Sequence, residues 1–175
     1  MSDVLAQSLS MLRTCIDRWS AISRVDAELL ARQPQPGQWS AIQALQHVLD
    51  TELPIFNARV LAIRSGETFR GFDPDREGRV DRIADSAAVL VEQLRPMREE
   101  SLATLESVVP AELERQGRHA ELGPVTMAEL LNEWAAHDTM HIVQAERALM
   151  QPFISGSGPW RGYFADHDVE RRVEA

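Results

Sequence analysis

Apolar residues recur every three or four positions along most of the chain, and this spacing predicts α-helices. No segment shows the sustained alternation of β-branched and polar residues that is typical of strands bounded by hairpin turns. A first helix is predicted from about Asp3 to Ala31. Two prolines and a glycine within residues 33–37 then end it, because they cannot continue a helix. The pattern indicates an all-α fold.

The second helix is predicted to begin at Ser40. Residues 40–43 form a capping box, in which the Ser40 hydroxyl and the Gln43 side chain each satisfy a free backbone N–H. The helix runs to about Arg64. Pro54 lies inside it and lacks an N–H to donate, so we expect a kink there.

Two more helices follow. The third spans about Ile83 to Val108, with Pro96 as another expected kink or break. The fourth opens at a second capping box, formed by Thr126 and Glu129, and reaches about Met150. Four helices of this length predict a four-helix bundle.

The connections are rich in Gly, Pro and charged residues. Residues 65–82 are predicted to form a long surface loop, a kind of segment that often serves as a lid or stays disordered. The tail from Gln151 carries four aromatic residues, which we expect to cover the domain: Phe153, Trp160, Tyr163 and Phe164. The length of 175 residues suits a single domain spanning residues 1–175.

Composition narrows the function. The chain has 27 acidic and 18 basic residues, a net charge of −9, and this opposes nucleic-acid binding, which needs a basic patch. No lysine is present, which excludes Schiff-base and lysine general-base chemistry. The single cysteine, Cys15, allows no intramolecular disulfide. With no signal-like segment and no long apolar run, we expect a cytoplasmic protein that does not enter membranes.

Two histidines stand where core residues are expected. His137 and His141 fall on the apolar face of the fourth helix, together with Trp134. At i and i+4 their rings lie one above the other and can converge on one metal ion. The alternative is that both are hydrogen-bonded core residues. A zincin motif is excluded, because Asp138 stands where that motif requires glutamate.

A third ligand must come from another helix, and His47 on the second helix is the natural candidate. Its position gives little support, because it lies away from the apolar stripe of that helix, which consists of Ile42, Leu45, Leu49, Leu53 and Phe56. The expected kink at Pro54 can change which face of the helix points inward.

Three segments together resemble a known family. They are residues 39–40 (Trp-Ser) followed by 47–52 (His-Val-Leu-Asp-Thr-Glu), residues 122–126 (Leu-Gly-Pro-Val-Thr), and residues 133–144, which contain His-Asp-Thr-Met-His. This arrangement resembles the DinB/YfiT-like superfamily over most of the chain. The resemblance implies a four-helix bundle whose centre binds a divalent metal through His47, His137 and His141. It also implies a homodimer, and either transfer of a low-molecular-weight thiol such as bacillithiol or mycothiol, or metal-dependent hydrolysis.

Three neutral histidines leave open positions on a divalent ion, where a thiol or a water can be deprotonated. We expect zinc or nickel, with manganese or iron as alternatives. The leading interpretation is a metal-dependent transferase that acts on a small-molecule thiol and an electrophilic substrate, or a related hydrolase. The alternative is a non-catalytic, metal-stabilised dimeric stress-response binding protein. That alternative predicts no substrate-sized cavity beside the ion.

Other polar residues receive weaker expectations. Arg147 can attract an anionic thiol, Cys15 is expected to be buried as a small hydrophobe, and His119 and His167 are expected to be exposed. Candidates for orienting the histidine rings lie on or beside the ligand helices: Asp50, Glu52, Glu133, Asp138 and Gln144.

Overall fold

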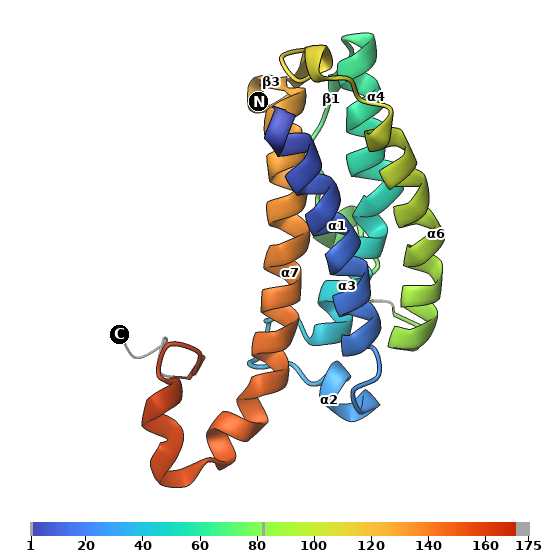
Figure 1. The fold of residues 1–175 in the computed structure, drawn as a ribbon. Helices are drawn as coiled ribbons and strands as arrows, with labels where there is room; N and C mark the ends of the chain where they lie inside the picture. The colour runs from blue at the N-terminus through green and yellow to red at the C-terminus, as the bar shows by residue number, and fades with distance from the viewer. Residues whose placement is uncertain (1, 82, 171–175) are drawn as a thin grey trace.

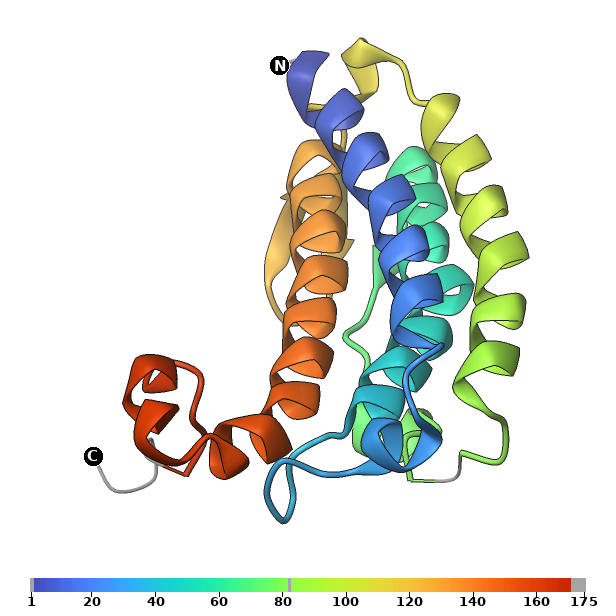
Figure 2. The ribbon, with the colours of Figure 1, turned by 60° about the horizontal axis from the view of Figure 1, so that its bottom comes forward.

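Four long helical segments run side by side, as Figures 1 and 2 show from two directions. The computed structural model describes residues 2–81 and 83–170. The segments are α1 (Ser2–Ile22); a continuous run of α3 (Ala41–Thr51), the π-helix η1 (Glu52–Asn57) and α4 (Ala58–Ser65); α6 (Ala87–Glu106); and α7 (Met127–Gly156). Helices α1 and α3 each pack against both α6 and α7. The prediction of a four-helix bundle is confirmed.

Both predicted capping boxes start their helices. At the start of α3, Ser40 Oγ accepts a hydrogen bond from the backbone N–H of Gln43, whose side chain accepts one from Ser40 N at 2.9 Å. At the start of α7, Thr126 Oγ1 accepts from Glu129 N at 3.1 Å, and Glu129 accepts from Thr126 N at 2.7 Å. These bonds satisfy backbone donors that have no partner inside the helix.

The first predicted helix is two helices. Helix α1 ends at Ile22, and a separate short helix, α2 (Ala27–Ala31), follows. The break has a local cause, because the Asp26 carboxylate accepts hydrogen bonds from Glu28 N and Leu29 N and so caps a new helix. In the third segment the helix is shorter than predicted at both ends but continues through Pro96.

The π-helix η1 contains Pro54, where the kink is predicted. A single π turn accommodates about one extra residue, so it rotates all later residues by about 100° relative to an uninterrupted α-helix. An unbroken helix would separate His47 from Arg59 by about 120° around its axis, whereas the π turn reduces this angle to about 20°. His47 and Arg59 therefore share one face of a continuous helical segment.

One buried arginine joins all four helical segments. Arg98 of α6 donates from Nε and Nη2 to the Glu52 carboxylate at 2.7 and 2.9 Å. From Nη1 it donates to Asp138 Oδ2 at 2.7 Å and to the carbonyl of Leu12 at 2.9 Å. Trp19 Nε1 donates to Asp138 Oδ1 at 3.4 Å. The three charged side chains are each 1% exposed, and such burial is tolerated only when the charges are paired.

A small sheet, absent from the sequence prediction, lies at one end of the bundle. Strand β2 (Gln116–His119) pairs antiparallel with β3 (Gly123–Thr126) and parallel with β1 (Thr68–Phe69). Its central glycine, Gly117, packs so closely on α4 that an added Cβ would lie 2.8 Å from Ile63 Cγ1. The remaining short elements are α5 (Pro74–Glu77) and the 3-10 helices η2 (Pro110–Glu112) and η3 (Gly158–Phe164). The segment predicted as one loop, residues 65–82, therefore contains β1 and α5.

The C-terminal aromatic residues do not cover the bundle, so that expectation is wrong. Helix α7 continues past Met150 to Gly156 and carries η3 beyond the end of the bundle, where Figure 1 shows it bent away from the other helices. Phe153, Trp160 and Tyr163 are 66%, 62% and 84% exposed. Among residues 2–81 and 83–170, none of the helices combines the length and the apolar character that spanning a bilayer requires.

Candidate metal centre

Three histidine rings meet between α3 and α7. His47 comes from α3, and His137 and His141 come from successive turns of α7. The Nε2 atom of His137 lies 3.0 Å from that of His47 and 3.2 Å from that of His141. The potential ligand atoms of all three lie within 4.8 Å of one another. Two nitrogen ligands each about 2.0–2.1 Å from a tetrahedral ion are ~3.3 Å apart, so this spacing suits one divalent ion.

The surroundings keep these rings neutral at pH 7. Burial, with a contribution from the neighbouring His141, lowers the pKa of His47 to about 4. Burial and the two neighbouring histidines lower the pKa of His137 to about 2. Burial also lowers the pKa of His141, against the opposing effect of its hydrogen bond to Gln144. A neutral imidazole offers the lone pair that a metal ion requires.

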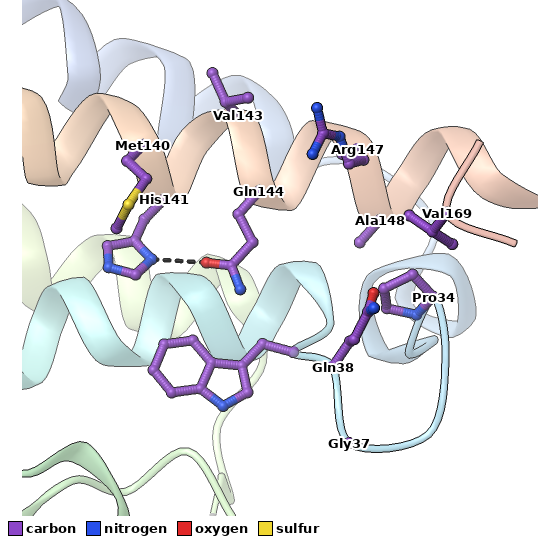
Figure 3. Close-up of a pocket in the computed structure, with 11 residues that line it drawn as sticks. Pro34, Gly37, Gln38, Met140, His141, Val143, Gln144, Arg147, Ala148 and Val169 are labelled. Carbon is purple, nitrogen blue, oxygen red and sulfur yellow. Dashed lines mark hydrogen bonds between the residues drawn. The ribbon is translucent and has the colours of Figure 1, made fainter. Parts of the chain in front are cut away.

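Gln144 orients one of the three rings. Its Oε1 lies 2.8 Å from His141 Nδ1, a contact that Figure 3 marks with a dashed line. An amide oxygen only accepts, so Nδ1 is the donor and the lone pair is on Nε2, which faces the other histidines. The other four candidates for this role lie against arginine side chains in the described structure. Asp50 binds Arg79, Glu133 lies near Arg59, and Glu52 and Asp138 bind Arg98.

The segment after α4 covers the His47 side of the cluster. The ring centroid of Phe72 lies 5.8 Å from that of His47. Arg79 fixes this segment to α3, because its backbone N and its Nε donate to the Asp50 carboxylate at 2.6 and 2.7 Å. The segment thus contributes Phe72 to the wall of the site.

A large open groove borders the cluster at His141. It has a volume of about 710 Å³, within the range of ligand-binding pockets. Trp39 forms part of its wall and stacks on His141 with ring centroids 5.8 Å apart. In Figure 3, His141 and Gln144 point from α7 toward the α3 side of the groove, and Val143 and Arg147 lie on another side of α7. The groove provides the substrate-sized cavity that the non-catalytic alternative excludes.

A second, smaller cavity of about 170 Å³ borders the cluster at His47 and His137. Its wall also contains a guanidinium and a carboxylate, those of Arg59 and Glu133. Burial raises the pKa of Glu133, and Arg59 opposes this effect. The other lining residues are Thr51, Ile55, Phe56 and Phe72. The two recesses share no lining residue.

The remaining sequence expectations have mixed outcomes. Cys15 is buried as expected, and burial raises the pKa of its thiol to about 12. His167 is exposed as expected, but His119 is buried. His119 belongs to β2, and its Nδ1 accepts hydrogen bonds from Glu121 N and Leu122 N at 3.2 Å. The sequence pattern does not indicate Arg59 and Phe72 as site residues, because their positions depend on the π-helix and on the covering segment.

The fold and the site together define a class of protein: a four-helix bundle in which one helix contributes a histidine and another contributes His-x-x-x-His. The DinB superfamily model matches residues 11–145, and the chain belongs to that family. Among solved structures it is similar to YfiT from Bacillus subtilis, described as a probable metal-dependent hydrolase with an unusual four-helix bundle topology. The identity is 16%, the TM-score is 0.71, and the match covers 82% of this chain and 85% of YfiT. No curated protein sequence matches the chain.

Proposed function

We propose that His47, His137 and His141 bind one divalent metal ion, and that the protein is a metal-dependent transferase of a low-molecular-weight thiol to an electrophile. The observation that carries the proposal is the convergence of the Nε2 atoms of three neutral histidines beside a groove of about 710 Å³. A divalent ion held by three histidines has open positions at which thiolate is favoured over thiol, or hydroxide over water. We expect zinc or nickel, with manganese or iron as alternatives.

Residues around the cluster have distinct roles in this proposal. The open groove has room for a thiol cosubstrate, and Arg147 on its wall provides a cation for an anionic one. Gln144 holds the His141 ring in the orientation that directs Nε2 at the ion. Glu133 lines the small cavity, and its raised pKa makes its carboxylate a suitable acceptor for the proton that a water in that cavity releases.

Hydrolysis is the second candidate, because YfiT is described as a probable metal-dependent hydrolase. The two reactions use the same residues and differ in the nucleophile, so products distinguish them. A transferase joins the thiol sulfur to the electrophile, whereas a hydrolase consumes water and needs no thiol. The non-catalytic binding protein is disfavoured, since it predicts no cavity where the groove lies.

Elemental analysis of protein purified without a histidine tag or added metal tests the proposal. We expect about one divalent ion per chain, lost in both His137→Ala and His141→Ala. The exposed His167→Ala is the matched control and should keep its metal. If the wild type holds no metal and takes up neither zinc, nickel nor manganese, the histidines are core residues and the enzymatic proposal fails. A metal-loaded protein is then assayed for consumption of thiols in the presence of electrophiles.

We also propose that the protein forms a homodimer through the exposed C-terminal aromatic residues. Helix α7 carries Trp160 and Tyr163 beyond the end of their own bundle. The same chain has an uncovered apolar groove of about 510 Å³ between α1 and α7, to which Met11 and Met140 contribute. Two such surfaces on one chain suit a second copy. Light scattering should show a dimer for the wild type and a monomer for a Trp160→Ser, Tyr163→Ser double variant.

A further inference from the structure

Arg59 of α4 is a largely buried cation whose donors are poorly satisfied. Its side chain is 12% exposed, and its Nε has no hydrogen-bond partner within residues 2–81 and 83–170. Nη2 donates to the carbonyl of Arg70 at 3.3 Å, and Nη1 lies 3.8 Å from Glu133 Oε2, too far for a hydrogen bond. Arg98, by contrast, forms close ion pairs with two buried carboxylates. Burying a guanidinium with unmet donors costs free energy, and a ligand can offset that cost.

The position of Arg59 is fixed by aromatic rings rather than by acids. Its guanidinium carbon lies 5.7 Å from the ring centroids of both Phe56 and Phe69. Such contacts hold the guanidinium plane while leaving its N–H groups free to donate. The π turn brings Arg59 to the face of the helix that carries His47, and both line the 170 Å³ cavity. The guanidinium and the histidine cluster therefore border the same small space.

We propose that this cavity is an anion-binding subsite, in which Arg59 binds a compact carboxylate group of the electrophilic substrate. The volume equals that of roughly five or six water molecules, which suits a small acid group and excludes a cofactor-sized thiol. The planar guanidinium matches a carboxylate in shape and charge. Identifying the anion as part of a substrate rests on the proposed function, whereas the binding of an anion by Arg59 requires no metal.

Glu133 determines how strongly this subsite attracts anions. Within residues 2–81 and 83–170 its carboxylate forms the one ion pair of Arg59, yet its side chain is 49% exposed and compensates the charge only weakly. An incoming carboxylate competes with Glu133 for Arg59. Removing the charge of Glu133 should therefore strengthen anion binding, an effect opposite to that of removing Arg59.

Acetate is the probe, and the Nε–H signal of Arg59 in proton–nitrogen correlation spectra is the readout. The signal is assigned by its absence in Arg59→Lys. The titration is done on metal-free and zinc-loaded full-length protein, with acetamide as the neutral analogue. We expect acetate to shift this signal in both forms, with a dissociation constant on the order of millimolar because so few atoms make contact. Acetamide should cause no comparable shift.

Three variants test the assignment of the binding to Arg59. For Arg59→Gln, acetate binding is followed through the backbone amides of the cavity, and we expect affinity to fall more than about tenfold. For Glu133→Gln, we expect roughly two- to fivefold tighter binding, since ion pairs of that exposure are weak. The matched control is Arg64→Gln on the same helix, because Arg64 is already paired with Glu112 at 3.1 Å. It should bind acetate as the wild type does.

The outcomes separate this proposal from the metal proposal. Acetate binding that occurs only with zinc and persists in Arg59→Gln would mean that the anion binds the ion alone, and would overturn the subsite. Equal losses in Arg59→Gln and Arg64→Gln would indicate general surface charge and would also overturn it. If the protein takes up no metal but acetate still shifts the Arg59 signal, the subsite stands and the metal proposal fails. Should Arg59→Gln fail to fold, the sign of the Glu133→Gln effect decides.

Discussion

Replacing Arg98 by methionine should greatly destabilise the protein. Methionine keeps the unbranched apolar stem but leaves the carboxylates of Glu52 and Asp138 buried without the cation that now contacts both at 2.7 Å. Removing one partner of such a buried network costs about 3–5 kcal/mol of folding free energy. We expect that loss at pH 7, measured by urea denaturation followed by far-ultraviolet circular dichroism.

The loss should depend on pH in a defined direction. Burial raises the pKa of Glu52 in the native protein, and Arg98 opposes that effect, so the variant should have a still higher Glu52 pKa. When folding raises the pKa of a carboxyl, the folded state holds the proton more tightly than the unfolded state does. The protein is then more stable at pH values below the unfolded pKa, and it loses this stability as the pH rises through the folded pKa. The stability difference between wild type and Arg98→Met should therefore shrink from pH 7 to pH 5.

A surface arginine provides the matched control. Arg18 contacts Glu146 at 2.8 Å, but these side chains are 34% and 46% exposed. Exposed pairs contribute about 0–1 kcal/mol, so Arg18→Met should cost no more than that. If Arg98→Met costs as little as Arg18→Met, with the same dependence on urea concentration, the reasoning about the buried network is refuted.

Three further predictions follow from the site and the sheet. The metal-free protein should lose about 2 kcal/mol of stability for each of His47 and His137 as the pH falls from 7 to 5. Folding lowers the pKa of both histidines, so the unfolded chain binds protons first, near pH 6.5. Urea titrations that show no loss of stability would contradict this. Gln144→Ala should weaken zinc binding about 10–100-fold, measured by competition with a chromophoric chelator, and Gln144→Glu should restore part of it. Gly117→Ala should cost about 1–3 kcal/mol in thermal unfolding, because the new Cβ would press on Ile63, whereas Gly156→Ala meets no atom within 4 Å and should not.

Local signals in the sequence determine much of the bundle. The capping boxes at Ser40 and Thr126 and the apolar spacing placed the starts of α3 and α7 correctly, because caps act through neighbouring atoms. The sequence also predicted that the rings of His137 and His141 lie on one face, because only one turn of an uninterrupted helix separates them. The break at Asp26 also has a local signal, because an N-cap residue stands there inside an apolar stretch.

The position of Arg59 relative to His47 was not readable in this way. Helical periodicity assumes about 100° per residue, and the π turn between them changes the phase of everything that follows. Pro54 marked an irregularity without specifying its type. The strands were missed because each has only two to four residues, too few to show alternation, and β2 contains a glycine that fits only against α4. For the same reason His119, which belongs to β2, was wrongly expected to be exposed.

The two separate recesses beside the histidine cluster have a consequence for the order of substrate binding. One borders His141 and the other borders His47 and His137, and they share no lining residue. Two reactants that occupy different recesses do not exclude each other, so both can be bound before any bond forms. In the proposed transferase, initial rates measured at varied concentrations of both substrates should then give intersecting reciprocal plots, as in a ternary-complex mechanism, and not the parallel lines of a ping-pong mechanism.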